Sequence, residues 1–494
     1  MPSTKQDITS LLNKVYSLVP QSSYQAYIVG GFIRDRQLGR DTDDIDIAVN
    51  DDVPRLAKEI ADALGGKYFM LDEANHIARV IVQDNQDILH LDFSQFSSNI
   101  EIDLARRDFT INAMAIELGD FVSGSRNIID PFLGQADLNS KLIRAVSNKI
   151  FQEDSVRLLR AVRLAKELGF EIEAKTEKLI VKDAKLVENI PGERIREELL
   201  RLFSLSDSAD TLYYMDQLGL LLRIIPELSA MKDVEQPKEH YWNVFDHSLE
   251  TVATACYLLR ESGWKYDSGD LLKRTPWSAE ICIHFNEEIS RGSSRRILLK
   301  LGGLLHDIAK PTTKTVEDTG KMRFLGHGKI GALMVAPILE RLRFSSREVK
   351  LVQNLVYHHL RPAQMSNVGL PTNKAIFRYF RDTEGAGIDI LFLALADYLA
   401  TSGPNLDINE WNQHNEMINF ILSEYSRQET EVIPVKLIDG HDIMCALGIS
   451  PGPIVGELLT EIREAQVAGN LRTKEEAIAL VHHYMEKRYR GFAS

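Results

Sequence analysis

The stretch Tyr27–Asp35 constrains the fold of this chain most, because a short apolar run meets two adjacent glycines there. It reads Tyr-Ile-Val-Gly-Gly-Phe-Ile-Arg-Asp, which predicts a strand, a glycine turn and the start of a helix. Gly30 and Gly31 leave backbone N–H groups uncovered, so phosphate oxygens can approach closely. Arg34 and Asp35 follow at the helix start. A Gly-Gly turn alone is weak evidence for phosphate binding, so the next segment decides its meaning.

Two carboxylates follow the glycine turn on a second apolar run, Asp44-Ile-Asp-Ile-Ala-Val49. Asp44 and Asp46 are two residues apart on a strand-like segment, so both side chains project from the same face. Such a pair is repulsive unless cations lie between the carboxylates, and two Mg²⁺ ions use this arrangement to hold an attacking hydroxyl and a leaving phosphate. The alternative to a metal site is an ordinary Asp-x-Asp pair on a solvated strand edge. The glycine turn nearby favours the metal site.

The composition excludes several classes of protein. A chain of 494 residues suggests roughly three or four domains, and 44% hydrophobic with 26% charged residues is typical of globular proteins. The net charge of −13 argues against a nonspecific nucleic-acid binder, so any nucleic-acid contact must use local basic surfaces. The three cysteines are scattered, and neither a signal peptide nor a membrane-spanning run is visible, so we expect a cytoplasmic protein.

A third polar segment, Asp103–Ala115, places two arginines, an aspartate and an asparagine within what we expect to be two helical turns. Arg106 and Arg107 can bind a triphosphate through bidentate contacts, and Asn112, one turn from Asp108, can reach a ribose hydroxyl. A surface helix with charge pairs is the alternative. Three strands are expected before it, and Asp92 on the last of them is a candidate third metal carboxylate.

The segment Glu153–Gly169 has the pattern of an amphipathic helix that ends at a glycine. Asp154 and Arg157 are three residues apart, so on a helix they share a face. An Asp accepts and an Arg donates, so the pair can read the Watson–Crick edge of an incoming base. The alternative is an ordinary intrahelical ion pair, worth a few tenths of a kcal/mol.

Histidines and carboxylates recur in the second half of the chain on segments that we expect to be helices. Imidazole and carboxylate together suit Mn, Fe, Ni, Co or Zn better than Mg alone. A single histidine on an apolar helix is usually a satisfied core residue, but the recurrence favours a metal site. The order along the chain is His247, His306-Asp307, His327, His358-His359 and Asp397.

The first half resembles the polymerase-beta-like nucleotidyltransferases, and more narrowly the bacterial-type tRNA nucleotidyltransferase and poly(A) polymerase family. The segments that carry the resemblance are 27–49 and 103–164. It implies that Asp44 and Asp46 hold Mg²⁺, that the arginines bind the triphosphate, and that Asp154 with Arg157 selects C and then A. The implied reaction is attack of the terminal ribose hydroxyl of tRNA on CTP or ATP, with pyrophosphate leaving.

The second half resembles the HD phosphohydrolase superfamily through its histidine and aspartate series. By that analogy, one metal site consists of His247, His306, Asp307 and Asp397. Asp307 would bridge to a second site made by His327 with His358 and His359. Metal-activated water would then attack a phosphoester.

These resemblances imply a multidomain α+β fold: an α/β nucleotidyltransferase head followed by an all-α neck and body, an all-α HD domain and a helical, tRNA-contacting C-terminal region. The expected boundaries are 1–145, 146–235, 236–402 and 403–494. Three alternatives remain: a poly(A) polymerase, an HD phosphohydrolase with a vestigial RNA-binding head, and an RNA-binding scaffold without activity.

One short connection bears on how far such an enzyme builds the tRNA end. Only ten residues, Phe93–Ile102, lie between Asp92 and the next expected helix. Many complete CCA-adding members of the resembled family carry a longer mobile loop there, thought to reshape the base pocket from C to A. A short link has little reach. We therefore expect partial addition, CC only or A only.

Overall fold

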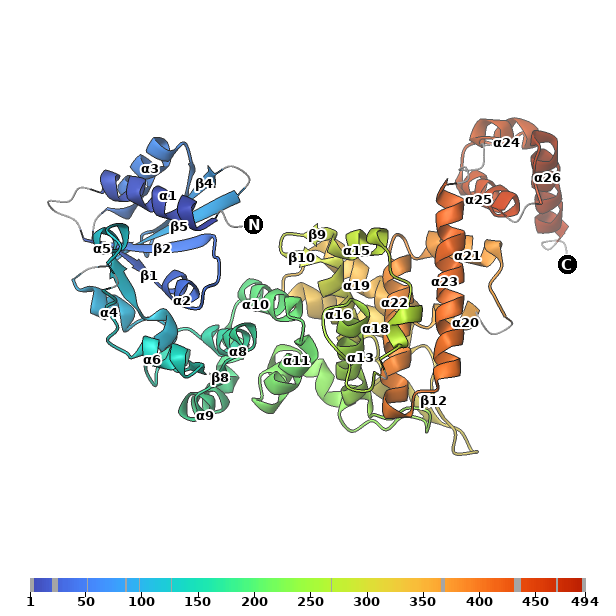
Figure 1. Ribbon diagram of the computed structural model, residues 1–494. Coiled ribbons are helices and arrows are strands. Elements are labelled where there is room, and N and C mark those ends of the chain that lie inside the picture. Colours follow the sequence, from blue (N-terminus) through green and yellow to red (C-terminus); the bar gives the residue numbers. More distant parts are fainter. Residues whose placement is uncertain are drawn as a thin grey trace. The chain divides into compact units, whose positions relative to one another are not determined.

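The computed structural model describes ten segments of the chain: 4–19, 25–50, 52–84, 87–96, 98–125, 127–267, 269–365, 369–430, 437–467 and 470–490. Contacts divide the chain into two compact units. The first unit consists of Met1–Ile190 with Tyr214–Ile224, and the second consists of Pro191–Tyr213 with Ile225–Ser494. The mixed head, the helical second half and the helical C-terminus confirm the predicted fold class (Figure 1).

A six-stranded sheet forms the centre of the first unit, with strand order β3-β4-β5-β2-β1-β6. Strands β2 and β5 are parallel, and the other neighbours are antiparallel. The sequence predicted strands β1 to β5 and the glycine turn after β1 correctly, whereas β6 was not predicted. Their bounds are β1 Ala26–Val29, β2 Asp44–Val49, β3 Lys67–Asp72, β4 Ile77–Asp84, β5 Asp87–Gln95 and β6 Ala115–Glu117.

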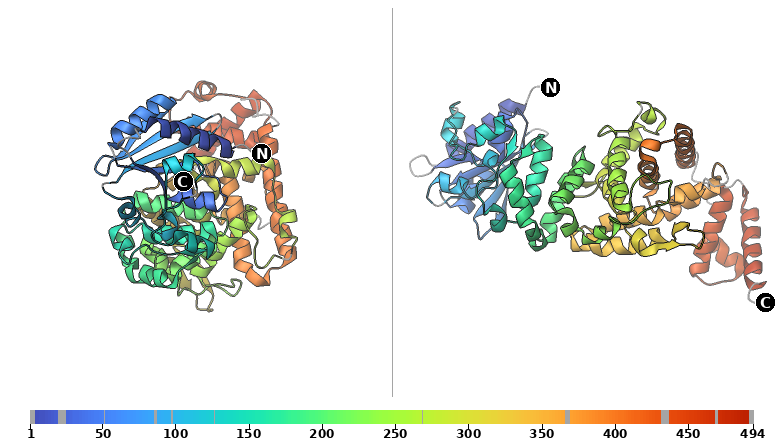
Figure 2. Two further views of the ribbon diagram at one scale, coloured as in Figure 1. Left: turned by 60° about the vertical axis from the view of Figure 1, so that its left-hand side comes forward. Right: turned by 90° about the horizontal axis from the view of Figure 1, so that it is seen from below.

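One face of this sheet is covered by helix α3, Val53–Leu64, with α1, Thr4–Leu18, beside it (Figures 1 and 2). Helix α3 begins where the Asp52 side chain accepts a hydrogen bond from the Arg55 N–H, and it ends at Gly65, which has φ of 65°. The residues that face α3 are buried on β4 and β5 and half-buried on β3. Along β3, β4 and β5 the alternate residues are exposed or half-buried, so this part of the opposite face is open to solvent.

The remaining helices of the first unit are short and connect the sheet to the following segment. A small parallel pair joins β7, Leu142–Ile143, to β8, Glu171–Ile172. The helices are α2 Gly31–Gln37, α4 Ile100–Leu104, η1 Thr110–Asn112, α5 Leu118–Val122, α6 Gly134–Asn139, α7 Ile150–Glu153, α8 Arg157–Leu168, α9 Ala174–Asp183, η2 Ala184–Asn189 and α12 Leu221–Ile224. Helix α11, Ser208–Gln217, contributes to both units.

Two helix predictions in this unit were wrong. The segment from Asp103 is not two helical turns, because α4 ends at Leu104, residues 105–108 form a turn and a bend, and Phe109 forms a β-bridge with Ala145 before η1. The helix expected over Glu153–Gly169 is broken at Asp154, which has an extended conformation with φ −150° and ψ 104°. Its carboxylate accepts a hydrogen bond from the Val156 N–H, so it favours a break over a continued helix. Asp154 and Arg157 therefore do not share a helix face.

The second unit is built on packed helices, with α13 against α16 and α22, and α19 against α16 and α18. Two small hairpins, β9–β10 and β11–β12, correct the expectation of an all-α HD domain. The elements are α10 Gly192–Ser204, η3 Pro226–Met231, α13 Val244–Leu258, α14 Leu271–Arg274, α15 Ala279–Asn286, β9 Glu288–Ser290, β10 Ser293–Ser294, α16 Arg295–Leu305, α17 Lys310–Thr313, β11 Lys314–Val316, β12 Met322–Phe324, α18 His327–Arg341, α19 Ser346–His358, α20 Arg361–Met365, α21 Asn373–Asp382, α22 Gly387–Ser402 and η4 Gly403–Asn405.

The C-terminal part of this unit is helical, as predicted. It contains α23 Ile408–Thr430, α24 Gly440–Leu447, α25 Pro453–Val467 and α26 Lys474–Arg490, and the last three pack around their own apolar cluster. Among the described residues, no single helix is long and apolar enough to cross a membrane; Asn373–Asp382 and Gly387–Asn405 pass that test only when counted together, with a bend of 101°.

Candidate active site and metal centre

The turn between β1 and α2 brings a glycine against a carboxylate and a guanidinium. Gly30 has φ of 76°, a conformation that residues with a Cβ rarely adopt. A Cβ at Gly30 would lie 2.6 Å from an Asp46 oxygen and 2.8 Å from an Arg107 nitrogen. Only glycine therefore fits, and the turn, Asp46 and Arg107 form one site.

The parallel pairing of β2 with β5 sets the carboxylates beside each other. Asp44 lies opposite His90, and Asp46 lies opposite Asp92. The Nδ1 of His90 is 2.9 Å from an oxygen of Asp44. Burial raises the pKa of Asp46; Arg107 lowers it, and Asp92 and Asp44 raise it further. This concentration of carboxylate oxygens fits Mg²⁺, which prefers oxygen ligands and would relieve the repulsion.

Asp92, the candidate third carboxylate, is already paired with a residue that sequence reasoning missed. Both oxygens accept hydrogen bonds from Arg79 on β4, each at 2.7 Å. Arg79 also lies 4.0 Å from Asp44. A bidentate pair of this kind holds the guanidinium plane in a fixed orientation. The sequence did place Arg79 on a predicted strand. Only the pairing of β4 with β5 shows that it lies opposite Asp92.

Four residues singled out in the sequence form one chain of hydrogen bonds, and Arg160 extends it. The four are Arg34, Asp35, Asp108 and Asn112. Arg34 donates two bonds to Asp35, at 3.0 and 2.7 Å, and one to the Asn112 side chain at 2.7 Å. Asn112 in turn donates to Asp108 at 3.0 Å. Asp108 also accepts from Arg160 at 3.1 Å. Although burial raises the pKa of Asp108, Arg160 and the Asn112 amide lower it below its ordinary value.

The arginines after α4 differ in their surroundings. Arg107 forms an ion pair with Asp103 at 3.3 Å, next to the Gly30 turn. Arg106 is exposed, and its backbone carbonyl accepts a hydrogen bond from Arg157 at 2.7 Å. A second Arg157 nitrogen donates to the Ile150 carbonyl at 3.3 Å. Arg157 is thus fixed against the segment that carries Arg106 and Arg107.

In the second unit, three imidazoles point their Nε2 atoms into one cluster. The Nδ1 atoms of His306, His327 and His359 lie 2.7 to 2.8 Å from backbone carbonyls, which can only accept a hydrogen bond. Each Nδ1 therefore carries a hydrogen, so each ring, when neutral, directs the lone pair of its Nε2 into the cluster. His327 Nε2 and His359 Nε2 are 3.0 Å apart. Facing lone pairs at this distance are repulsive, so the cluster fits a cation.

Two carboxylates complete this cluster. Asp307 lies 3.1 Å from the His306 Nε2 and 3.3 Å from the His327 Nε2, and it is 1% exposed. Asp397 lies 3.0 Å from the His247 Nε2. Two ligand groups share Asp307: His247, His306 and Asp307, and Asp307, His327 and His359. The donors are imidazole nitrogens and carboxylate oxygens, the set that transition metals prefer.

The two carboxylates of the cluster attract positive charge, although burial opposes it. Burial lowers the pKa of His306, but Asp307 outweighs this and raises the value to about 10. Burial lowers the pKa of His359 to about 3. Lys310 is buried, and its ammonium lies 2.6 Å from Asp307. The carboxylates therefore gather positive charge, which a divalent metal would supply.

Of the two consecutive histidines, the structure brings only one into the cluster. His359 lies 3.9 Å from Asp307, whereas the His358 ring packs against Tyr357 with centroids 4.6 Å apart. Helix α19 ends at His358. Successive residues of a helix project about 100° apart, so both rings cannot face one cluster. The structure therefore does not bring His358 together with His327 and His359, as the sequence had suggested.

A cavity of about 270 Å³ opens onto this cluster. Asp307, His327, His359 and Asp397 lie at its base, and Lys310 and Arg323 add positive charge. His240, which sequence reasoning missed, also lines it, with its ring centroid 5.7 Å from that of His247. Burial lowers the pKa of His240 to about 4. The cavity thus combines a potential metal site with groups that can hold an anion.

Family profiles match successive parts of this chain. The Poly A polymerase head domain profile matches residues 26–144, the HD domain profile matches 244–402, and a tRNA nucleotidyltransferase domain 2 profile matches 410–481. The chain is 32% identical to an A-adding tRNA nucleotidyltransferase of Deinococcus radiodurans, covering 94% of this chain and 96% of the relative. It is 30% identical to a CC-adding tRNA nucleotidyltransferase of Thermus thermophilus, over 93% of both chains.

Solved structures share the fold. An apo CCA-adding enzyme has a TM-score of 0.63 at 21% identity, covering 97% of this chain and 95% of the other. A Thermotoga maritima CCA-adding enzyme, solved in complex with tRNA, has a TM-score of 0.59 at 21% identity, covering 98% and 96%.

Proposed function

Because this chain belongs to the bacterial-type tRNA nucleotidyltransferase family, we propose that it adds C or A nucleotides to the 3′ end of tRNA. The observation that carries the proposal is the single site formed by the Gly30 turn, Asp46 and Arg107. In the proposed reaction, the terminal ribose hydroxyl attacks the α-phosphate of CTP or ATP and pyrophosphate leaves.

Asp44 and Asp46 are the proposed Mg²⁺ ligands. Bound Mg²⁺ supplies positive charge that activates the attacking hydroxyl and stabilises the leaving pyrophosphate. Asp92 supports this site indirectly, since both of its oxygens are engaged by Arg79. His90 fixes the orientation of Asp44 through its Nδ1 contact of 2.9 Å.

The triphosphate is held, in this proposal, by the turn and by cations around it. The N–H groups at Gly30 and Gly31 can donate to phosphate oxygens. Arg107 lies beside the turn, and exposed Arg106 follows it in the chain. Arg34 with Asp35, and Asn112 with Asp108, provide the hydrogen-bonded frame that keeps this side of the site in position.

Asp154 and Arg157 are the proposed selectors of the incoming base. The two residues do not share a helix face, because Asp154 lies at the break between α7 and α8 and Arg157 begins α8. The role is supported instead by the contacts that hold each side chain. Asp154 accepts a hydrogen bond from the Val156 N–H just before α8, and Arg157 is anchored to backbone carbonyls of Arg106 and Ile150. Both side chains are thereby held close to the segment that carries the proposed triphosphate ligands.

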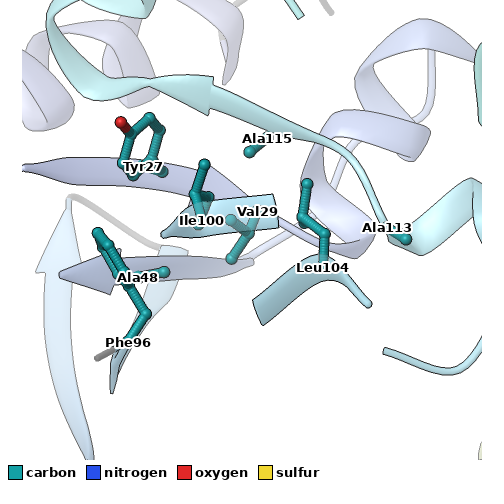
Figure 3. Packing of buried hydrophobic residues seen from close by; sticks show 8 residues of the cluster. All are labelled: Tyr27, Val29, Ala48, Phe96, Ile100, Leu104, Ala113 and Ala115. Atoms are coloured by element: carbon teal, nitrogen blue, oxygen red, sulfur yellow. The ribbon is translucent and has the colours of Figure 1, made fainter. Parts of the chain in front are cut away.

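We also propose that addition is partial, either CC only or A only. The connection after β5 is held by packing: Phe96 and Ile100 are buried with Tyr27, Val29, Ala48 and Leu104 (Figure 3). Strand β5 runs to Gln95, and Asn99 caps α4, so few residues are left to move. Ser97 of this connection lies outside the described residues. The A-adding and CC-adding relatives that match over nearly the whole chain also support partial addition.

The test of this proposal is incubation with tRNA that lacks its 3′ end and with each labelled nucleoside triphosphate separately. We expect incorporation of C or A only, with release of pyrophosphate. Unlimited addition of A would identify a poly(A) polymerase. Absence of any incorporation, on tRNAs ending before C, after C or after CC, would contradict the proposal.

A second activity is proposed for the metal centre: hydrolysis of a phosphoester such as a 2′,3′-cyclic phosphate. The supporting observation is the buried set of imidazole lone pairs around Asp307 beneath a cavity that contains Lys310. His247, His306, Asp307, His327, His359 and Asp397 are the residues that would hold Mn, Fe, Ni, Co or Zn. Bound there, such a metal would lower the pKa of a water molecule and so supply the nucleophile for hydrolysis. Purified protein that hydrolyses no phosphoester with Mn, Ni or Co would contradict this activity.

A further inference from the structure

The open face of the head sheet carries large apolar side chains at positions where water normally reaches. On β3, Phe69 is 46% and Leu71 is 51% exposed, and on β5, Ile88 is 55% exposed. These side chains share a face, because β3 pairs with β4 at Phe69 and Arg79, and β4 pairs with β5 at Arg79 and Asp92. The opposite face is buried on β4 and β5 and half-buried on β3, where α3 packs against these strands.

This face is continuous with the catalytic carboxylates. Asp92 lies opposite Asp46 in the register of β5 and β2, so Asp44, Asp46, Asp92 and Arg79 all belong to it. From β2 the order is β5, β4, β3. Strands are spaced by about 4.8 Å, so β3 lies roughly 14 Å from the carboxylates. That distance is within reach of the last few nucleotides of a single strand that ends at Asp44 and Asp46.

The direction of the reaction favours this face for the RNA substrate. The proposed triphosphate ligands, Gly30, Gly31 and Arg107, lie on the β1 side of β2. In nucleotidyl transfer, the attacking and leaving oxygens are roughly in line on opposite sides of the phosphorus. If pyrophosphate leaves toward β1, the attacking hydroxyl approaches from the side of β5, β4 and β3.

We propose that the open face of β3, β4 and β5 binds the single-stranded 3′ end of the tRNA substrate. Phe69 and Ile88 would pack against bases, since aromatic and apolar side chains on a sheet surface form stacking platforms for single-stranded RNA. Arg79, fixed by Asp92, presents a guanidinium plane beside the path, and Lys67 on β3 adds an exposed cation. This inference rests on the proposed nucleotidyl transfer.

The first test replaces the exposed aromatic ring. Phe69→Ala should raise KM for tRNA by roughly 5- to 100-fold, the range for loss of one stacked base, while KM for CTP and ATP changes less than about 2-fold. Phe69→Tyr should restore the parent value. Val181→Ala, at an equally exposed apolar position of α9 in the same unit, is the matched control and should change neither constant.

A second test reports contact directly. All four tryptophans, at positions 242, 264, 277 and 411, lie outside the head. Phe69→Trp therefore introduces an indole whose emission, relative to the parent, should be quenched by tRNA ending in CC. The same tRNA should leave the difference unchanged when its single-stranded 3′ nucleotides are removed.

Three outcomes would overturn the proposal. Unchanged KM for tRNA in both Phe69→Ala and Ile88→Ala would show that the face does not bind the substrate. An equal rise in KM for CTP would assign it to the nucleotide. Loss of a dimer on Phe69→Ala, measured by sedimentation, would assign it to a second copy of the chain. If the parent added no nucleotide at all, the proposed reaction would fail, whereas quenching of the indole would still test this face.

Discussion

The two acidic clusters of this molecule differ most in their exposure to solvent. In the head, the Asp44 side chain is 64% exposed and lies on an open sheet face beside His90 and Arg79. In the second unit, Asp307 is 1% exposed and is surrounded by imidazoles. The head carboxylates are presented by two parallel strands, whereas the second cluster is assembled from helix ends far apart in the sequence.

This difference indicates two ways of using a metal. An open pair of carboxylates offers few ligands, so Mg²⁺ is expected to exchange and to arrive with the nucleotide. A buried cluster of neutral imidazoles and carboxylates is expected to keep a transition metal through purification. The head is therefore suited to a substrate that comes and goes, and the buried centre to a resident ion.

The largest expected effect is on the head. Asp46→Ala should reduce nucleotide addition by roughly 10³-fold or more, because it removes a ligand for charge stabilisation worth several kcal/mol. Asp43→Ala, in the exposed segment just before β2, is the control and should retain addition. Steady-state incorporation of labelled CTP and ATP is the measurement. Near-normal turnover of Asp46→Ala would show that the head carboxylates do not hold a catalytic metal, and the comparison between the two metal sites would fail.

The next effect separates the two consecutive histidines. His359→Ala should weaken metal retention by roughly 100-fold or more and remove phosphoester hydrolysis, while His358→Ala should keep both. Metal content by mass spectrometry after dialysis, together with hydrolysis of a 2′,3′-cyclic phosphate, measures this. Nucleotide addition should survive in both variants. Equal metal loss in the two would show that the ring packed on Tyr357 is a ligand after all.

A smaller effect is expected on base choice. Asp154→Ala or Arg157→Ala should reduce discrimination against UTP and GTP by about 5- to 150-fold, from about 1–3 kcal/mol per bidentate reading pair. The rate with the preferred nucleotide should fall less than the selectivity. Competition between labelled nucleotides measures the ratio. Preserved selectivity in both variants would leave these residues as structural supports only.

The smallest effect concerns a third charge cluster, which is intermediate in exposure. Glu464 of α25 is 2% exposed, and it pairs with half-exposed Lys374, Arg378 and Arg381 of α21. Hydrogen bonds from Arg378, with a smaller opposing effect of burial, lower the pKa of Glu464 to about 2. A depressed folded-state value stabilises the protein above the ordinary pKa near 4.5, and this stability is lost as pH falls toward 2.

Glu464→Gln should therefore cost about 1–3 kcal/mol at pH 7, with solvent screening of the arginines favouring the lower end. The difference between the variant and the parent should shrink as pH falls from 4.5 to 2. Hydrogen exchange of α24–α26 measures the local stability. A difference that does not change with pH would exclude the ion pairs as its cause.

Sequence reasoning was most successful where local signals decide structure. The glycine turn, the alternating strands and the paired carboxylates of β2 were all predicted, because each depends on residues close in the chain. The recurrence of histidine and aspartate also predicted most of the buried cluster. His306, Asp307, His327 and His359 come together as expected.

The remaining features depend on packing that no local pattern contains. The break at Asp154 results from competition between its side chain and the helix backbone. The choice between His358 and His359 depends on the rotation of α19, and the pairing of Arg79 with Asp92 depends on strand register. The role of His240 could not be predicted, since its segment has no regular pattern and only tertiary contact brings it to His247.

The central claim is that this chain builds part of the CCA end of tRNA. It is tested most directly by single-turnover reactions with three tRNAs, ending at the discriminator base, after one C, or after CC, each with CTP and ATP present. The account predicts one of two patterns: two C residues are added and the reaction halts, or only the tRNA ending in CC is extended, by one A. Efficient synthesis of the full CCA end from the discriminator base would contradict it.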